Sequence, residues 1–541
     1  MSTRAVPLAV LLALAVPLSV VIAAPAAASP MASTPGGSPF DFIPVESLES
    51  PTQVRDDGAV LIEVTADAGS LDAVEAAVAE VAEIVTVADD FGVVVAWAQP
   101  DAIEAIDALD DVRSIVAPPP PSNGSVSVSA APPADWITAP QCRSVQVESD
   151  SPLKAAIARA DGGVDGTGIS VGVISDSYDV STTAATNAAD DVALGVLPGP
   201  GNPCGYETPV TVVADNTAGT DEGRAMVQLV HGIAPGARLL FAPGFPSAYV
   251  MADSIRALVA AGADIIVDDV SYFTEPIVQA GVVADAVADA KSQGVAYYSS
   301  AGNASIISSD MTQIGGWASS SFTTAPCPVP LNVPSLSCLD FGLTAPDATN
   351  RITLERNAAG ELDVATWLRW SQPWYGIDAP MGMALLTTDP VNPQVVVASL
   401  CSDATPTAPS VCSQPWSATT VRDVLPNLPI GDTVELDLVV FSDASPTVLA
   451  GVAVSMTFRE RKGALLALEH DDSGTGLGRD VIVGATLTVN NAAKGVFAVG
   501  AADVETPSKI EGFSSWGATT WRWESVSSQT VGTPAALLAT P

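Results

Sequence analysis

The hydrophobic positions of residues 58–117 follow two spacings in turn, an alternation and a helical repeat. The alternation predicts strands at 60–64, 84–87, 93–97 and 112–116, and the repeat predicts helices at 71–81 and 102–109. This order, β-α-β-β-α-β, is typical of a ferredoxin-like α/β unit. A run of prolines ends the unit, and a tether rich in Ser, Pro and Ala follows to about residue 140.

Residues 165–303 are patterned differently, with short and mostly apolar runs between helical stretches. Such runs are typical of strands buried on both faces of a parallel sheet. Strands are predicted at 169–174, 239–242, 265–267 and 295–298, and helices at 224–230, 252–261 and 278–291. From 305 to 485 Pro, Ser and Thr increase and alternation returns, which predicts an inserted antiparallel β-domain. The α/β pattern resumes at 485–501.

The first 28 residues are typical of a secretion signal. One Arg precedes a nearly continuous apolar stretch at 5–24, and Ala26-Ala27-Ala28 offers a small-residue cleavage site. A membrane anchor is the alternative, since the apolar stretch is almost long enough to span a bilayer. The polar, Pro-rich continuation favours cleavage near Ser29. We therefore expect a secreted, extracellular protein that has no membrane contact after cleavage.

The cysteines fit an oxidising compartment. Cys327/Cys338 and Cys401/Cys412 are each eleven residues apart and could close local disulfide loops, which would leave Cys142 and Cys204 as a longer-range pair. Zinc ligation is the weaker alternative, because the chain has no Cys-x-x-Cys.

The charge balance narrows the range of partners. There are 21 Lys and Arg against 61 Asp and Glu, so the net charge is −40. Such a chain does not bind nucleic acid or an anionic membrane through bulk electrostatics. Intrinsic disorder is disfavoured because 48% of the residues are hydrophobic and only 15% are charged. Two histidines exclude a His-rich metal site. No cofactor is expected, and calcium stays open without an assignable loop.

Three polar residues stand at ends of predicted elements, where parallel α/β sheets hold their sites. Asp176 follows the strand at 169–174, Glu222 opens a helical stretch, and Asn303 follows the strand at 295–298. Each has a structural explanation as well. An Asp or a Gly-Asn pair after a strand is usually a turn former, and an acidic residue that opens a helix usually complements the helix dipole.

Together these segments resemble the subtilisin and sedolisin serine peptidases over 165–303 and 485–517. The resemblance rests on Val173-Ile174-Ser175-Asp176-Ser177, Asp221-Glu222-Gly223-Arg224-Ala225, Ile233-Ala234-Pro235-Gly236-Ala237, Ala263-Asp264-Ile265-Ile266, Ser300-Ala301-Gly302-Asn303, Val496-Phe497-Ala498-Val499-Gly500-Ala501 and Phe513-Ser514-Ser515-Trp516-Gly517. It implies a catalytic Asp176, Glu222 in the place of the catalytic His, and Asn303 as oxyanion donor. It also implies polypeptide substrates and a propeptide at 58–117 that assists folding and inhibits the enzyme.

The resemblance to sedolisins is mixed. Sedolisins carry an Asp four residues after their Glu, and that position is Met226 here. They also use Asp in the oxyanion site, where this chain has Asn303. Asp268 and Asp269 follow the strand at 265–267, and either could supply another carboxylate or cap the strand.

A glutamate base changes the expected pH range. Its unperturbed pKa is about 4.3, against about 6.5 for His, so a carboxylate base suits acidic conditions. If Glu222 and Asp176 are buried together, we expect them to share one proton. His231 lies nine positions after Glu222, on the opposite face of the helix, and is expected to be structural.

The family's nucleophile motif, Gly-Thr-Ser-x-Ala-x-Pro, is absent from this sequence. The nearest echo, Gly532-Thr533-Pro534-Ala535-Ala536, has Pro in the place of Ser. Trp516, Trp521 and Trp523 mark an abrupt change in composition, which indicates a gene truncated or shifted out of frame after Gly517. Ser525, Ser527 and Ser528 are available hydroxyls without the motif around them.

These patterns divide the chain into six segments. They are a signal peptide (1–28), a propeptide-like α/β domain (29–117), a Pro/Ser/Ala-rich linker (118–150), a first peptidase-like part (151–304), the inserted β-domain (305–485) and a truncated second peptidase-like part (486–541). Three functions follow: a secreted serine endopeptidase made as a proenzyme, a non-catalytic pseudopeptidase that binds peptides or surfaces, or an inactive product.

Overall fold

The structure is a computed structural model, and it describes only part of the chain. The described residues are 52–123, 147, 149–356, 362–402, 412–422, 428–461, 463–488, 493, 496–517, 525 and 526. The predicted signal peptide (1–28) lies outside them, as does most of the predicted linker. Within this described part, no helix has the length and apolar character needed to cross a membrane.

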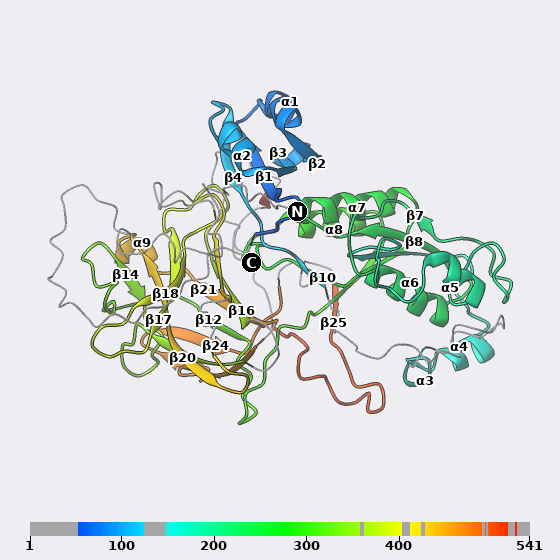
Figure 1. The fold of residues 1–541 in the computed structure, drawn as a ribbon. Helices are drawn as coiled ribbons and strands as arrows, with labels where there is room; N and C mark the ends of the chain where they lie inside the picture. Colours follow the sequence, from blue (N-terminus) through cyan, green and yellow to red (C-terminus); the bar gives the residue numbers. More distant parts are fainter. Residues whose placement is uncertain are drawn as a thin grey trace, which may run out of the picture.

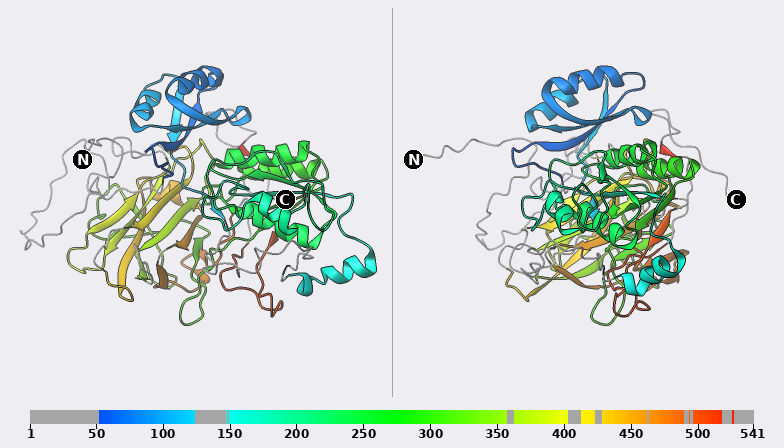
Figure 2. Two further views of the ribbon diagram at one scale, coloured as in Figure 1. Left: turned by 45° about the vertical axis from the view of Figure 1, so that its right-hand side comes forward. Right: turned by 90° about the vertical axis from the view of Figure 1, so that its right-hand side faces the viewer.

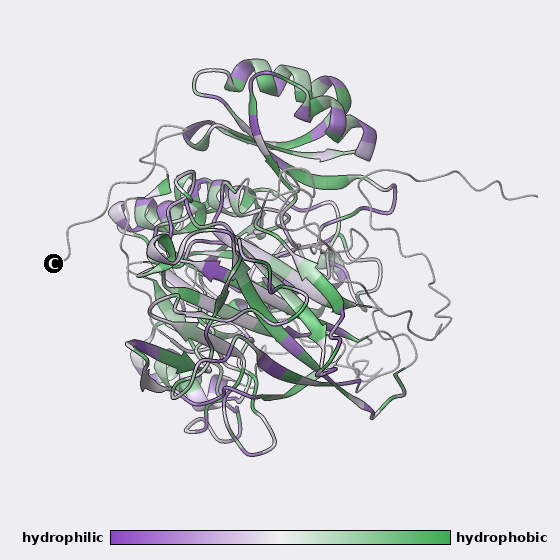
Figure 3. Cartoon of the chain, turned by 90° about the vertical axis from the view of Figure 1, so that its left-hand side faces the viewer, coloured by the Kyte–Doolittle hydropathy of each residue, from purple (hydrophilic) through white to green (hydrophobic). Residues whose placement is uncertain are grey.

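Residues 60–116 form what we call the N-terminal unit, with the order β-α-β-β-α-β (Figure 1). Its elements are β1 (Val60–Ala66), α1 (Leu71–Val81), β2 (Ala82–Ala88), a 3-10 turn (Asp89–Phe91), β3 (Val93–Ala98), α2 (Pro100–Asp107) and β4 (Val112–Val116). The sheet order β2-β3-β1-β4 is antiparallel throughout. Figure 3 shows polar and hydrophobic residues side by side on both helices.

The two faces of this sheet bury different residues, because side chains alternate along a strand. Ile62 and Val64 pack under the helices of the unit. Leu61, Val93 and Val95 face the other way and belong to a cluster shared with α7 (Ala248–Ala260) and α8 (Val282–Ser292). The N-terminal unit is therefore docked through an apolar sheet face, and Figure 2 shows it seated above the rest of the molecule.

A six-stranded parallel sheet organises the second part, which we call the parallel-sheet unit. Its order is β25-β11-β9-β6-β8-β7, and every pair is parallel. The strands are β6 (Ser170–Ser175), β7 (Thr211–Val212), β8 (Arg238–Pro243), β9 (Ile265–Asp268), β11 (Ala296–Ser300) and β25 (Phe497–Val499). The helices of this unit besides α7 and α8 are α3 (Asp150–Leu153), α4 (Ala155–Gly162), α5 (Ala188–Leu194) and α6 (Glu222–Ile233).

Both faces of the parallel sheet are covered, as its continuous apolar strands predict. Along β6, Val173 packs in a cluster with Val227 of α6, and Ile174 packs in the cluster of α7 and α8. The predicted strands at 169–174, 239–242, 265–267 and 295–298 thus correspond to β6, β8, β9 and β11.

Two antiparallel sheets occupy residues 316–483, which we call the β-domain. One sheet has the order β19-β16-β21-β12-β24-β23, and the other has β13-β14-β20-β15-β22 with β17 and β18 attached to β20. The strands are β12 (Gly316–Ser319), β13 (Thr324–Ala325), β14 (Ser337–Leu339), β15 (Asn350–Glu355), β16 (Asp363–Trp370), β17 (Met381–Thr387), β18 (Val395–Ser399), β19 (Trp416–Arg422), β20 (Thr433–Ser442), β21 (Val454–Glu460), β22 (Ala464–Leu468), β23 (Gly474–Gly476) and β24 (Arg479–Val483), with a short helix α9 (Pro446–Leu449). Trp317, Trp370 and Met456 are among the buried residues of its largest core cluster.

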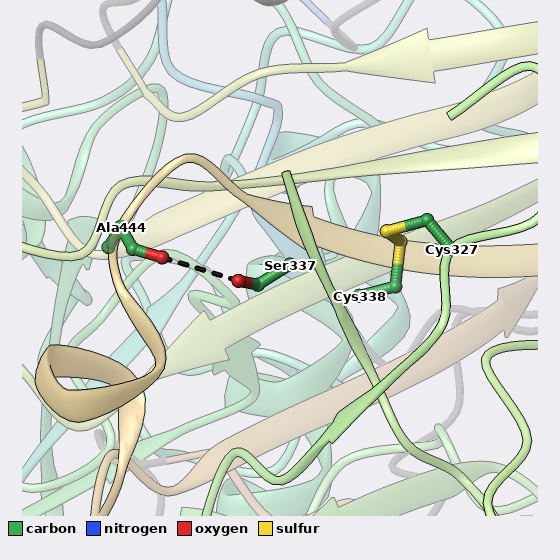
Figure 4. Close-up of a disulfide and its surroundings, with 4 residues drawn as sticks. All are labelled: Cys327, Ser337, Cys338 and Ala444. Atoms are coloured by element: carbon green, nitrogen blue, oxygen red, sulfur yellow. Dashed lines mark hydrogen bonds between the residues drawn. A yellow bond between two sulfur atoms is a disulfide. The ribbon is translucent and has the colours of Figure 1, made fainter. Parts of the chain in front are cut away.

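One predicted disulfide is confirmed. Cys327 and Cys338 are joined, with Cα atoms 5.2 Å apart, beside a hydrogen bond from Ser337 Oγ to the carbonyl of Ala444 (Figure 4). Cys204 is also disulfide-bonded, and its predicted partner Cys142 lies outside the described residues. The predicted Cys401–Cys412 disulfide is wrong, because no S–S bond joins these two residues.

Candidate functional site

The carboxyl ends of β6, β9 and β11 lie at one edge of the parallel sheet. The strands are neighbours in the order β11-β9-β6 and end at Ser300, Asp268 and Ser175. Parallel α/β sheets form their sites at this edge. The three predicted residues, Asp176, Glu222 and Asn303, all belong to segments that begin here.

Asp176 holds the start of α6 in place. Its carboxylate is buried, and Oδ2 accepts hydrogen bonds of 2.6 Å from both the backbone N–H and the hydroxyl of Thr220. Oδ1 accepts from the backbone N–H of Glu222 at 3.1 Å. Asp176 therefore contacts the backbone of Glu222, and its Oδ1 pairs one of the N–H groups that the first turn of a helix leaves unpaired, while Oδ2 holds Thr220 just before the helix.

The N-terminus of α6 has little freedom to move. Asp221 precedes the helix in a left-handed conformation, φ 62°, and its Oδ1 accepts from the backbone N–H groups of Val180 and Ser181. A Cβ on Gly223 would overlap the ring of Phe241 and a backbone carbonyl oxygen, so only glycine fits this close approach to β8. Arg224 is buried and pairs with Asp179, Asp191 and Asp221.

The Glu222 carboxylate is partly buried and accepts a hydrogen bond of 2.9 Å from Ser175 Oγ. Burial is the largest cause that raises its pKa, to about 7, and the negative charges of Asp269 and Asp176 add to it. Hydrogen bonds from Ser175 and Asn123 oppose the shift. The group therefore changes protonation near neutral pH.

The chain that follows the N-terminal unit crosses this site. β5 (Ser122–Asn123) pairs antiparallel with β10 (Val270–Ser271), with Ser122 opposite Ser271. The side chain of Asn123 is hydrogen-bonded to Glu222. Nothing in the sequence pattern predicts β5, since backbone pairing to an edge strand requires no hydrophobic alternation. The linker predicted at 118–150 thus begins with residues held in the site.

Asn303 follows the end of β11 and is exposed. It follows Gly302, whose positive φ of 86° is suited to glycine, and a Cβ there would lie 3.1 Å from Ser271 Oγ. Ser515 fixes this loop, because its N–H donates to the Gly302 carbonyl at 2.8 Å and its Oγ accepts from Ala304 N–H at 3.0 Å. The predicted segments 300–303 and 513–517 are therefore in direct contact.

Asp268 and Asp269 differ in their surroundings. Asp268 is buried and accepts from Ser299 Oγ at 2.7 Å. Burial raises the pKa of Asp268 to about 7. Asp269 is partly exposed and acts on Glu222 through its charge. Of the two, Asp269 is the additional carboxylate of the site.

The β-domain also contributes to this region. The charge of Asp269 raises the pKa of Arg459 on β21, while burial, the larger cause, lowers that pKa to about 10. Sequence reasoning missed Arg459, Asn123 and Thr220 as neighbours of the site. Arg459 lies 190 positions beyond Asp269 (459 − 269) in a strand whose alternation indicates only burial.

The remaining candidates lie elsewhere. Ser525 donates a hydrogen bond to Asp285 on α8, and Ser527 and Ser528 lie outside the described residues. His231 is buried against the edge of the Tyr206 ring, and burial lowers the pKa of His231 to about 4.

One group in the described part of the chain could hold a metal ion. The ligand atoms of Asp347, Glu469 and His470 in the β-domain lie within 4.8 Å of one another. His470 Nε2 is 3.2 Å from Asp347 Oδ2, and the backbone N–H of Arg351 donates to Glu469 at 3.4 Å. The side chains of Asp347, Glu469 and His470, which would bind an ion, thus already take part in contacts within the chain.

No family model matches the sequence. No curated protein matches it either. Among solved structures, the chain is similar to the epidermin leader peptide processing serine protease of Staphylococcus aureus (TM-score 0.28, 10% identity, 46% of this chain and 61% of that one). It is also similar to fervidolysin of Fervidobacterium pennivorans, a keratinolytic enzyme related to subtilisin (0.26, 18%, 50% and 44%), and to the CspB protease of Clostridium perfringens (0.34, 9%, 70% and 78%).

The chain spans 61% and 44% of the first two of these proteases. At identities of 9–18% and TM-scores of 0.26–0.34, the assignment of this chain to a protease family remains a proposal.

Proposed function

We propose that the chain is built as a secreted serine-type endopeptidase of the subtilisin/sedolisin kind, in which Glu222 is the general base. The observation that carries the proposal is the Glu222 carboxylate, which lies at the carboxyl edge of a parallel sheet and is hydrogen-bonded to a strand of polypeptide. A base in this place must face the substrate peptide, and the contact of Glu222 with Asn123 supports that role.

The chemistry assigned to Glu222 is proton transfer. In peptide hydrolysis the base takes a proton from the attacking hydroxyl and returns it to the leaving amine. Because its pKa is raised to about 7, Glu222 is suited to this exchange near neutral pH, not only in acid. Asp176 positions Glu222 by accepting a hydrogen bond from the Glu222 backbone N–H. Asn303 has the role of donor to the oxyanion.

The role of the N-terminal unit in this proposal is that of a propeptide. Two contacts support it: its apolar sheet face packs on α7 and α8, and the segment that follows it adds a strand to β10 next to Glu222. A polypeptide held there excludes a substrate from the same edge. The proposed partners are therefore polypeptide substrates and the chain's own propeptide.

The alternative is a non-catalytic, secreted peptide-binding pseudopeptidase. It is favoured by the absence of Gly-Thr-Ser-x-Ala-x-Pro from the sequence and by the position of Ser525, which is hydrogen-bonded to Asp285 on α8. Removing the nucleophile of a Ser triad leaves only a residual rate, several orders of magnitude below normal. We therefore expect little or no hydrolysis by the chain with the present sequence.

The test compares the purified chain with one that carries a family-like Gly-Thr-Ser-x-Ala-x-Pro segment at 532–538. A fluorophosphonate probe, which labels only an activated Ser, is expected to react with the second chain alone, and casein hydrolysis to follow the labelling. Glu222→Gln in the second chain is expected to abolish both. Strong casein hydrolysis by the unmodified chain that is lost in Ser525→Ala would contradict the absence of a nucleophile. Probe labelling that Glu222→Gln leaves unchanged would remove Glu222 from the mechanism.

A further inference from the structure

The β-domain carries three side chains of the kinds that bind metal ions, and the proposed peptidase does not use them. Asp347 lies before β15, and Glu469 and His470 follow β22 directly. β15 and β22 pair antiparallel, with Ile352 opposite Leu468, so the chain that enters β15 and the chain that leaves β22 meet at the same end of the pair. The pairing thus brings together residues up to 123 positions apart, which we call the ligand group.

The separations within the ligand group fit a single ion. The atoms that Asp347, Glu469 and His470 offer all lie within 4.8 Å of one another, and His470 Nε2 is 3.2 Å from Asp347 Oδ2. A nitrogen and an oxygen bound to one zinc ion, each at about 2.0–2.2 Å, stand roughly 3–3.5 Å apart at the angles of octahedral and tetrahedral sites. The contact between these two side chains therefore already has the spacing of two ligands of one ion.

The carboxylate of Asp347 is oriented by its neighbours. The backbone N–H of Asp347 donates to Asp340 Oδ1 at 2.9 Å, and its carbonyl accepts from Phe341 N–H at 2.7 Å. Its Oδ1 accepts from the N–H and the hydroxyl of Thr349 at 3.0 and 2.8 Å. Hydrogen bonds of this kind to one carboxylate oxygen fix the direction of the other in metal sites. Asp347 Oδ2 is the oxygen that is presented to His470.

His470 is held in a similar way. Its ring lies nearly parallel to that of Phe341, at an interplanar angle of 8° with centroids 6.5 Å apart. Its backbone N–H donates to Asn350 Oδ1 at 3.0 Å. Asn350 is fully buried, and its Nδ2 has no hydrogen-bond partner among the described residues. Buried polar atoms without a protein partner typically contact a bound water or ion, so this amide indicates a further polar group beside His470.

The charge around the ligand group favours a cation. Burial is the largest cause that raises the pKa of Asp471, the residue after His470, and the charges of Asp472 and Asp310 add to it. These three carboxylates therefore surround an imidazole that already contacts a fourth, Asp347. A divalent ion bound there relieves the repulsion between them.

We propose that the ligand group binds a divalent transition-metal ion such as zinc, which fastens the edge strand β22 to the chain that enters β15. The donor set decides the class of ion, because an imidazole nitrogen with carboxylate oxygens suits zinc and its neighbours, whereas calcium and magnesium prefer oxygen ligands alone. β22 stands at the end of the sheet order β13-β14-β20-β15-β22, so the ion holds this edge strand to its neighbour in the sheet. The site lies in the β-domain, and the inference does not rest on the proposed peptidase.

The test measures zinc binding to the full chain after dialysis against a chelator. Calorimetric titration with zinc chloride is expected to show one site that an excess of calcium or magnesium does not compete for. His470→Gln removes the nitrogen ligand and should weaken zinc binding more than about 100-fold, since even an outer partner of a metal ligand is worth about 10–100-fold. The control, Asp472→Asn, removes a nearby charge but no ligand, and should weaken it less than about ten-fold, because an exposed charge contributes little. Equal zinc affinity in His470→Gln and the unmodified chain would overturn the site.

A second measurement follows the histidines directly. The chain has only two, so a chain labelled with ¹⁵N in its histidines gives two sets of imidazole signals in an NMR spectrum. Zinc is expected to shift the set of His470 and to leave that of His231, which is buried against Tyr206, unchanged. Glu469→Gln keeps both histidines and should abolish the shift at the zinc concentration that saturates the unmodified chain. Zinc that shifts neither set, or shifts the set of His470 equally in Glu469→Gln, would contradict the proposal even if His470→Gln failed to fold.

Discussion

At the scale of single residues, Glu222 shows how position changes an ordinary carboxylate. Burial and the nearby charge of Asp269 raise its pKa from 4.5 to about 7, while the hydrogen bond from Ser175 limits the shift. Asp176, the predicted partner of Glu222, accepts hydrogen bonds from Thr220 and from the Glu222 backbone. Among the charges that raise the pKa of Glu222, that of Asp269 comes before that of Asp176, and the proton shared with Asp176 stays a prediction.

This pKa predicts how stability depends on pH. Between pH 4.5 and 7 the folded chain keeps a proton on Glu222 that the unfolded chain loses, so the stability due to the protonated group decreases as pH rises and is lost above 7. A shift of this size, reduced for partial exposure, corresponds to about 1–2 kcal/mol. The glutamine in Glu222→Gln does not titrate. When the pH rises from 4.5 to 8, this variant should therefore lose about 1–2 kcal/mol less stability than the unmodified chain, as measured by thermal unfolding. The control is Glu80→Gln on the exposed side of α1, which removes a carboxylate outside the candidate site. A Glu222→Gln effect that is the same at both pH values would contradict the raised pKa.

Gly223 is a second residue whose role the structure makes testable. An added Cβ would overlap the Phe241 ring and the carbonyl oxygen of Ser177, and the carbonyl belongs to the backbone and cannot turn away. Gly223→Ala is therefore expected to destabilise the fold by about 1–3 kcal/mol, as overpacking does. The matched control is Gly162→Ala, at the end of α4, where the nearest atom lies 3.4 Å away in a side chain. Thermal unfolding of both variants measures the difference, and equal melting temperatures would show that α6 can move away from β8.

At the scale of elements, the sequence predicts what each strand and helix buries within its own unit. The apolar runs of β6, β8, β9 and β11 and the amphipathic spacing of α6 determine the parallel sheet, so Asp176 and Glu222 reach one edge as expected. The sequence does not predict β5, which is held by backbone pairing to β10. It also does not predict that β21 lies near Asp269, which depends on how the β-domain packs. Contacts between units are poorly predicted by the spacing of hydrophobic residues along the sequence.

The docking face of β1 leads to a prediction at this scale. Glu63 lies in the centre of that face and is only 7% exposed, with Ser247 Oγ donating to it at 3.3 Å. Burial raises the pKa of Glu63 to about 8. The ionisable groups around it are Tyr249 on α7, Tyr272, and Glu275, whose pKa is also raised by burial to about 8. None of them is a cation that could neutralise an ionised Glu63.

The docked state therefore binds a proton that the free N-terminal unit, with an ordinary Glu pKa, loses above about pH 4.5. Docking should be strongest in acid, weaken as pH rises from about 4.5 to 8, and then level off. The measurement is the fraction of the N-terminal unit that separates on gel filtration at pH 5 and at pH 8.5, after a protease has cut within 124–140. Glu63→Gln should reduce the change of that fraction between the two pH values. Release in acid and retention at pH 8.5 would reverse the sign and contradict the proposal.

At the scale of the whole molecule, three parts meet in one buried cluster. Val116 comes from the N-terminal unit, Phe273 and Ala304 from the parallel-sheet unit or the chain next to it, and Trp367 and Trp416 from the β-domain. The candidate site lies beside this junction, because β5 begins six residues after Val116 and its partner β10 ends two residues before Phe273. The geometry of the candidate site therefore depends on how the three parts are held together, and not on the parallel sheet alone.

Phe273 is the residue through which this coupling can be measured. Its ring stacks on Trp367 with centroids 4.7 Å apart and is 6% exposed, so Phe273→Ala should cost about 3–5 kcal/mol, the usual range for a buried aromatic. Since the lost contact joins two parts, we expect calorimetry to show the β-domain and the parallel-sheet unit melting in separate transitions. Phe322→Ala removes an equally buried ring from the core of the β-domain, and should lower the melting temperature of that domain without affecting its contact with the parallel-sheet unit. Two transitions in Phe322→Ala together with one in Phe273→Ala would show that the units are joined elsewhere. In that case the aromatic cluster would not be the contact that holds the two parts together.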